Sequence, residues 1–270
     1  MIVEAKPTSR VRTITHRDLP DTDGEMVQNP YQLPQATLLH SSIMPVLDRI
    51  HGDEPYLLGS DSGIYWSATK EPLDGCKAPD WYYIPGVTAK DEEGEKIRSY
   101  VIWSTGIRPI IVMEFVSGDG KDEHDKTYGK GKFWVYEQGI GAKYYVIFDT
   151  FHGGHIELYE LVRDRYRPVL PNSRGHYPIA DLEVELGVWQ GVHEKVECLW
   201  MRYFDSKGTM LPSGPEREKF LRERGDAEKL RAEQEKLRAE QEKLRADRTS
   251  SEMAELLARL KAKGIDPSSL

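Results

Sequence analysis

The sequence predicts a mixed α/β (α+β) protein, in which a mixed sheet flanked by helices is followed by a charged C-terminal helix. Two observations carry this prediction. Hydrophobic residues make up 39% of the 270 residues, and residues 34–214 hold more strand-like runs than helical ones, without regular alternation. From Pro215 onward, charged residues with a seven-residue leucine spacing replace these runs.

Three regions are expected along the chain. Residues 1–33 are polar and contain many turn formers, which indicates an irregular N-terminal arm. Residues 34–214 form the folded domain, and residues 215–270 form a charged helical tail. The net charge is −8; residues 216–270 hold 14 basic and 13 acidic residues, which leaves 23 basic and 32 acidic residues, net −9, in the rest. This acidic body argues against broad nucleic-acid binding but leaves room for a local basic groove or a metal site.

The folded region should begin with a helix. Apolar residues follow helical spacing in Gln35–Ile50, and Pro45 within this pattern should kink or divide the helix. Runs rich in β-branched and aromatic residues then predict strands at Gly63–Ser67, Trp81–Ile84, Tyr100–Trp103 and Ile110–Ser117.

The second half of this region should contain a helix, a strand and hairpins. Lys132–Gln138 is compatible with a short amphipathic helix, and Lys143–Asp149 predicts a strand. Three further strand segments are expected: an antiparallel pair, and one that opens a hairpin turning at residues 205–208; they are Ile156–Val162, Tyr166–Leu170 and Cys198–Phe204. This order favours a mixed sandwich over a doubly wound sheet.

The tail contains an internal repeat. The segment Lys229–Glu235 recurs at Lys236–Glu242, so Leu230, Leu237 and Leu244 lie seven residues apart. A strong coiled coil needs a second apolar position in each heptad, and polar or small residues stand at those places. Two interpretations remain open: a weak self-associating coiled coil, most simply a homodimer, and a solvated helix held by intrahelical Glu–Lys and Glu–Arg pairs.

Two carboxylates stand out among the strands. Asp80 follows Pro79 at the start of one predicted strand, and Glu114 lies inside the apolar run Ile110–Ser117. An ionised acid in a buried strand is costly unless it is paired or holds a cation. If the two strands pair, the carboxylates could hold Mg²⁺, which prefers carboxylate oxygens. Alternatively, Asp80 starts a strand or caps a turn, and Glu114 pairs with Arg98 or Arg108.

Three segments together resemble the Uma-two family of restriction-endonuclease-like proteins, within the PD-(D/E)XK nuclease superfamily. Residues 78–84 resemble the Pro-Asp strand of the family, and residues 111–117 resemble its glutamate strand. Residues 132–136 and 142–149 resemble its Lys-x-x-x-Tyr helix and the following aromatic strand. The resemblance covers about residues 34–200 and implies a restriction-endonuclease-like core.

The sequence departs from the superfamily motif at the lysine. The position two residues after the acid holds Val116, whereas in this family the lysine is thought to come from the next helix, which points to Lys132. Because the preceding loop is long, Lys126 and Lys130 remain rivals.

The resemblance implies an endonuclease that depends on Mg²⁺, with Mn²⁺ as a substitute, and hydrolyses DNA. Asp80 and Glu114 would hold the metal, and Lys132 would orient the attacking water or stabilise the transition state. The alternative is an inactive nuclease-like binding or scaffold module that oligomerises through its C-terminal helix.

Other patterns receive simpler interpretations. His152 and His155 with Glu157 could bind zinc, but a Gly-Gly turn separates the histidines, so the usual helical spacing is absent. His124 should be solvated. The aromatic run 81–83 could stack on bases, although core packing is the stronger expectation. No signal peptide or membrane-spanning apolar stretch is visible, so we expect a cytoplasmic protein.

Overall fold

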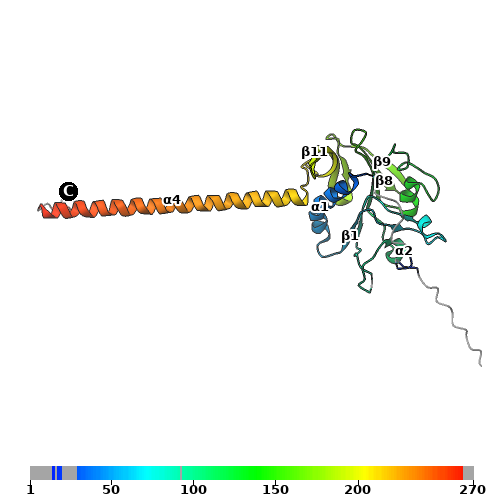
Figure 1. Cartoon of the computed structure of the whole chain (residues 1–270), viewed down its shortest axis with the longest axis horizontal. Coiled ribbons are helices and arrows are strands. Elements are labelled where there is room, and N and C mark those ends of the chain that lie inside the picture. Colours follow the sequence, from blue (N-terminus) through cyan, green and yellow to red (C-terminus); the bar gives the residue numbers. More distant parts are fainter. Residues whose placement is uncertain (1–13, 16, 20–28, 92, 264–270) are drawn as a thin grey trace, which may run out of the picture. The chain divides into compact units, whose positions relative to one another are not determined.

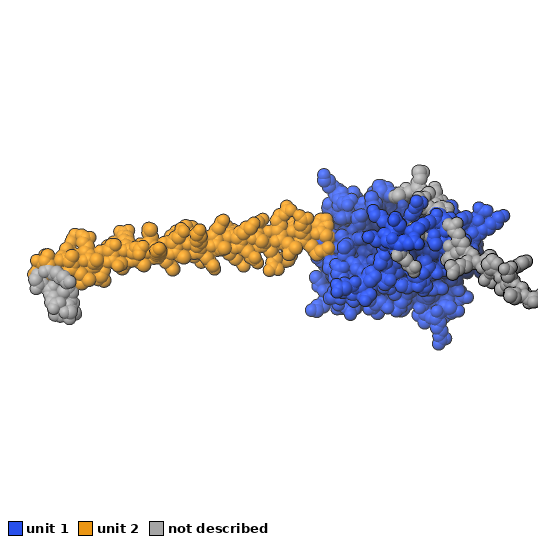
Figure 2. All heavy atoms as spheres, turned by 90° about the horizontal axis from the view of Figure 1, so that it is seen from below, with its two compact units in different colours: residues 1–213 blue, residues 214–270 orange. Residues whose placement is uncertain are grey.

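The computed structural model describes residues 14–15, 17–19, 29–91 and 93–263 (Figure 1). The chain divides into two compact units, residues 1–213 and 214–270 (Figure 2). Most of the expected N-terminal arm, residues 1–13, 16 and 20–28, lies outside the described residues. The first unit is a mixed α+β structure with a restriction-endonuclease-like core.

A six-stranded mixed sheet forms the centre of this unit, with the strand order β1-β4-β6-β7-β8-β9. Only β6 and β7 pair in parallel, and every other neighbouring pair in this sheet is antiparallel. The strands are β1 (Tyr56–Gly59), β4 (Trp81–Pro85), β6 (Ile111–Phe115), β7 (Tyr144–Asp149), β8 (His155–Val162) and β9 (Arg165–Val169).

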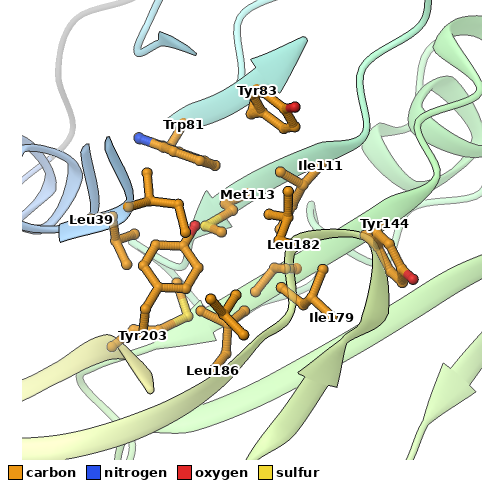
Figure 3. Close-up of a cluster of buried hydrophobic side chains, with 14 of the residues drawn as sticks. Leu39, Trp81, Tyr83, Ile111, Met113, Tyr144, Ile179, Leu182, Leu186 and Tyr203 are labelled. Atoms are coloured by element: carbon orange, nitrogen blue, oxygen red, sulfur yellow. The ribbon is translucent and has the colours of Figure 1, made fainter. Parts of the chain in front are cut away.

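Helix α1 (Gln32–His51) covers one face of the central sheet. Its Leu39, Ile43 and Leu47 are fully buried and pack with Trp81 and Met113 from the sheet (Figure 3). The same apolar cluster receives side chains from a second sheet, in the order β10 (Tyr177–Ile179), β11 (Val184–His193) and β12 (Val196–Asp205). This cluster is therefore a core shared by a helix and two sheets.

The opposite face of the central sheet is covered by a short helix with two geometries. It begins as α3 (Lys132–Trp134) and continues as the π-helical η2 (Val135–Ile140). Phe133, Tyr136 and Ile140 pack there against side chains of β4, β6 and β7. Gly141 ends the helix with φ of 66°, and a Cβ at this position would meet the Arg108 guanidinium, so this close approach needs a glycine.

Small elements complete the first unit. A three-stranded sheet has the order β3-β2-β5, and its strands are β2 (Ile64–Tyr65), β3 (Cys76–Lys77) and β5 (Tyr100–Val101). The remaining helical segments are η1 (Pro72–Gly75), α2 (Ile102–Thr105) and η3 (Ala180–Leu182).

Several expected elements need correction. Pro45 does not divide the first helix, because α1 continues to His51 with fully buried residues on both sides of the proline. The expected strand 63–67 is only the two-residue β2, and the strand 100–103 gives way to α2 at Ile102.

The expected hairpin at residues 198–204 also differs. Its strand, β12, pairs with the preceding β11 across a turn at Glu194 and Lys195, both with positive φ. The turn at residues 205–208 exists, closed by the hydrogen bond from the Gly208 N–H to the Asp205 carbonyl, but only an isolated bridge follows it.

The second unit consists of one long helix, α4 (Gly214–Ala262). Its leucine, methionine and phenylalanine side chains are exposed, including the three leucines of the repeat. Among the described residues, no helix has the length and apolar character that crossing a membrane requires.

Candidate active site

The strand pairing brings the two candidate carboxylates together. In the antiparallel pair β4–β6, Trp81 lies opposite Met113 and Tyr83 lies opposite Ile111. One step further, the same register places Asp80 opposite Glu114. The main-chain N–H of Phe115 donates to Asp80 Oδ2 at 2.5 Å, which holds this carboxylate beside β6.

Glu114 lies on the sheet face that α3 and η2 cover. Val112 and Val116, which alternate with it along the chain, belong to the apolar cluster on that face. Its residue is only 2% exposed, yet both carboxylate oxygens have partners. Lys132 Nζ donates to Oε2 at 2.9 Å, and the Tyr136 hydroxyl donates to Oε1. The cost of burying this acid is thus offset by an ion pair and a hydrogen bond.

Asp80 is buried without a cationic partner of its own. The Gln32 side-chain amide donates to Oδ1, and the Phe115 N–H donates to Oδ2. Burial, and next the negative charge of Glu114, raise the pKa of Asp80 well above the usual aspartate range, against the lowering effect of Phe115 and Lys132. Two acids that repel each other in a buried position form a site that favours a cation.

Lys132 links Glu114 to a third acid. Its ammonium donates to Glu123 Oε1 at 3.1 Å, in addition to the contact with Glu114. Burial of the ammonium lowers its pKa, but Glu114 and Glu123 together raise the pKa of Lys132 above the usual lysine range. Lys132 is therefore protonated at neutral pH, and it is a cation rather than a base.

The loop that carries Glu123 is held over the site by several contacts. The Tyr145 hydroxyl donates to the Glu123 carbonyl at 3.0 Å, and the Phe133 N–H donates to the Asp125 carbonyl at 3.0 Å. His124 contacts Glu157 at 3.1 Å and is only partly exposed, so it is not simply solvated, as expected from the sequence. Because the loop is anchored, Glu123 has a defined position beside Lys132.

The structure distinguishes the three lysines considered for the site. Only Lys132 contacts Glu114 among the hydrogen bonds and ion pairs of the described residues. Lys126 lies over the ring of Phe133, 4.4 Å from its centre, and Lys130 is exposed. Their catalytic roles stay a prediction, but Lys132 has the geometry that such a role requires.

The other patterns do not form a site. His152 contacts Asp149 at 2.7 Å, whereas Glu157 accepts from Tyr159 and contacts His124, so the expected zinc donors have other partners. Within the described residues, no group of three His, Cys, Asp or Glu side chains could hold a metal.

The remaining alternatives differ from the structure in the same way. Arg108 donates to the Ile140 carbonyl at 2.6 Å. The aromatic run 81–83 is buried in the core, so these rings do not form an exposed stacking surface.

Three residues of this site carried no role in the sequence prediction. Tyr136 lies four residues after Lys132, so both reach the same side of a helix, and this spacing could have indicated a joint contact. Glu123 stands in a charged loop segment without any apolar pattern, and Gln32 lies far from Asp80 in sequence. For these two residues no local signal exists, because tertiary contacts alone bring them to the site.

Comparison with known families agrees with the fold and the site. Residues 18–193 match the model of the Uma2 family, described as "Putative restriction endonuclease". The match spans more than half of the chain, so this protein belongs to the Uma2 family. No curated protein and no solved structure matched the chain. The matched range contains Asp80, Glu114 and Lys132 as well as Glu123 and Tyr136.

Proposed function

We propose that this protein is a Mg²⁺-dependent DNA endonuclease. Asp80 and Glu114 would hold the metal, Mn²⁺ would substitute for it, and Lys132 would be the catalytic cation. The observation that carries the proposal is the contact of two buried carboxylates and one ammonium from β4, β6 and α3 in a single cluster. Membership in the Uma2 family supports a nuclease reaction and DNA as the substrate.

The donor atoms of this cluster fit a hard divalent cation. Each oxygen of Asp80 and Glu114 accepts one of the hydrogen bonds described above, and a carboxylate oxygen has a second lone pair for a cation. Three acids share one ammonium, so a divalent cation would also balance the charge. Mg²⁺ commonly binds through one or two carboxylates and keeps several waters, which suits a site with two acidic ligands.

The residues of the chain have separate roles in this proposal. A bound Mg²⁺ supplies a polarised phosphodiester and a water of lowered pKa. Lys132, which is protonated, would donate to the phosphate oxygens as their negative charge grows, or orient the attacking water. It cannot accept the proton of that water, because its pKa is raised. Tyr136 holds Glu114, and Gln32 holds Asp80, in the orientation that metal binding needs.

Two exposed residues before α3 support a nucleic-acid substrate. Tyr128 is 83% exposed and lies 4.7 Å from the ring of Trp134, and Lys130 is exposed two residues before Lys132. An exposed aromatic ring can stack on a base, and a lysine can contact a phosphate. The contact of Lys132 with Glu114 favours this function over an inactive scaffold module, for which the absent motif lysine was an argument.

Cleavage of supercoiled plasmid DNA tests the proposed function. Wild-type protein with Mg²⁺ should nick or linearise the plasmid, EDTA should stop the reaction, and added Mg²⁺ or Mn²⁺ should restore it. The variants Asp80→Ala and Glu114→Ala should be inactive. Equal cleavage by the wild type and both variants, or cleavage that is insensitive to EDTA, would remove this mechanism.

Glu123→Ala is expected to lower kcat by about 10–100-fold, the usual effect of losing a residue that orients a catalytic group. An ammonium has three N–H donors, and Glu114 and Glu123 fix two of them, so the third has a defined direction. Glu123→Gln keeps an acceptor at this place and should recover most of the rate. Steady-state kinetics would separate kcat from KM, and Mn²⁺ affinity should not change, because Glu123 is not proposed as a metal ligand. A Glu123→Ala variant with wild-type kcat would show that Glu123 does not position Lys132.

A further inference from the structure

The repeat in α4 leaves an apolar stripe exposed on a continuous helix. Leu230 and Leu237 are each 56% exposed and Leu244 is 75% exposed, although α4 is helical over its whole described length (Figure 1). The leucines recur every seven residues, the period at which one helix keeps a constant face toward a parallel partner helix. Burial of a leucine stabilises an assembly by about 1.5–3 kcal/mol, so this stripe favours association.

Charges of opposite sign border the stripe. With the leucines at heptad position d, each following position e holds an arginine: Arg231, Arg238 and Arg245. Each position g, three residues after a leucine, holds an acid: Glu233, Glu240 and Asp247. The positions e and g are those that meet the partner helix in a coiled coil.

These bordering charges have no ion-pair partner within their own helix. The five intrahelical i,i+4 pairs described in α4 are 219–223, 218–222, 224–228, 248–252 and 255–259, all outside the repeated segment 229–245. The solvated-helix interpretation expected such pairs inside the repeat. Among the described residues, the repeat therefore offers free charges beside a free apolar stripe.

We propose that α4 pairs with α4 of a second copy of this chain in a parallel, in-register two-stranded coiled coil. In that orientation position g of one helix meets position e of the next heptad in the other, so Glu233 faces Arg238 of the second copy, and Glu240 faces its Arg245. In an antiparallel pair, acids would face acids and arginines would face arginines. The charge pattern thus selects one partner and one orientation.

The polar residues at position a agree with this choice. Gln234 and Gln241 would each meet the same residue of the second copy, where one amide can donate to the other. A polar pair at position a fixes the register but costs stability. The dimer is therefore specific but weak, and it dissociates more readily at high salt, because salt screens the pairs between e and g. This inference does not depend on the proposed nuclease activity.

Single cysteines test the orientation. Ala227→Cys and Gln241→Cys, both at position a, would be made in full-length protein carrying Cys198→Ser, because Cys198 is partly exposed whereas Cys76 is buried. Under mild oxidation both variants should form a disulfide-linked dimer on a non-reducing gel, and Ala239→Cys, at the outer position f, should not. An antiparallel pair allows at most one position to meet itself. Crosslinking at only one of the two positions, or equally at residue 239, would overturn the proposal.

Charge reversal tests the partner. Full-length protein should sediment as a dimer, and Leu237→Asp should raise its dissociation constant at least about tenfold, which corresponds to 1.4 kcal/mol. Reversing all three arginines to glutamate should give a monomer, and so should reversing Glu233, Glu240 and Asp247 to arginine. An equimolar mixture of the two reversed proteins should restore a dimer. A wild type that stays monomeric at high concentration, sediments as a trimer, or is unaffected by either reversal would contradict the inference.

Discussion

Replacing Lys132 with methionine is expected to lower the unfolding free energy by about 3–5 kcal/mol and to abolish DNA cleavage. Methionine keeps the apolar stem but removes the ammonium that contacts Glu114 and Glu123. Removing one partner of a buried ion pair leaves an uncompensated buried charge, and this accounts for the size of the effect. In a domain of this size, each kcal/mol corresponds to about 2–4 °C in the melting temperature.

Thermal unfolding without divalent cations measures this effect. Lys130→Met, at the exposed lysine two residues earlier, is the matched control and should change the unfolding free energy by less than about 0.5 kcal/mol. Adding Glu123→Gln to Lys132→Met should recover part of the lost stability, since one of the unpaired acids is removed, but not the activity. A Lys132→Met variant as stable as the wild type would show that this ammonium does not neutralise the buried acids.

Asp80→Asn is expected to raise the melting temperature at pH 7 while it lowers cleavage at least about 100-fold. Asparagine has nearly the shape of aspartate and keeps an oxygen for the Phe115 N–H. Its amide nitrogen would face Gln32, whose own amide can rotate to accept. The substitution removes a buried charge that Glu114 repels, and with it a metal ligand that would contribute several kcal/mol to the reaction.

The pH dependence of stability gives this prediction a sign. The pKa of Asp80 is raised in the folded state, so the folded protein binds this proton more tightly than the unfolded chain does. The contribution of Asp80 to stability is therefore present below the unfolded-state pKa and is lost as the pH rises through the folded-state pKa. Metal-free wild type should thus lose stability relative to Asp80→Asn as the pH rises from acidic values to neutrality. A constant difference across this range would mean that Asp80 is not destabilised by burial.

The sequence predicted the candidate site better than it predicted the sheet around it. Asp80 and Glu114 could be identified because acids next to buried apolar runs break a local pattern, and Lys132 because the family resemblance placed it. The two-residue β2 and the strand β11 were missed or misplaced, because neither has a strong local periodicity and their pairing partners are distant in sequence.

Pro45 shows how tertiary packing overrides a local preference. A proline inside a helix costs about 3 kcal/mol, yet Leu39, Ile43 and Leu47 are fully buried around it, and each contributes about 1.5–3 kcal/mol. Glu123 shows the opposite limit. Its charged neighbours predict a solvated loop, and only the position of Lys132 in space explains why it is 4% exposed.

Calorimetric titration with Mn²⁺ or Mg²⁺ tests the central claim most directly, because Asp80 and Glu114 are proposed to share one cation. The wild type should bind one ion per chain at this site, and either Asp80→Asn or Glu114→Gln should remove that binding. Glu160→Gln, at a half-buried acid of the same sheet, is the control and should bind like the wild type. Cation binding that is unchanged in both site variants would contradict the account.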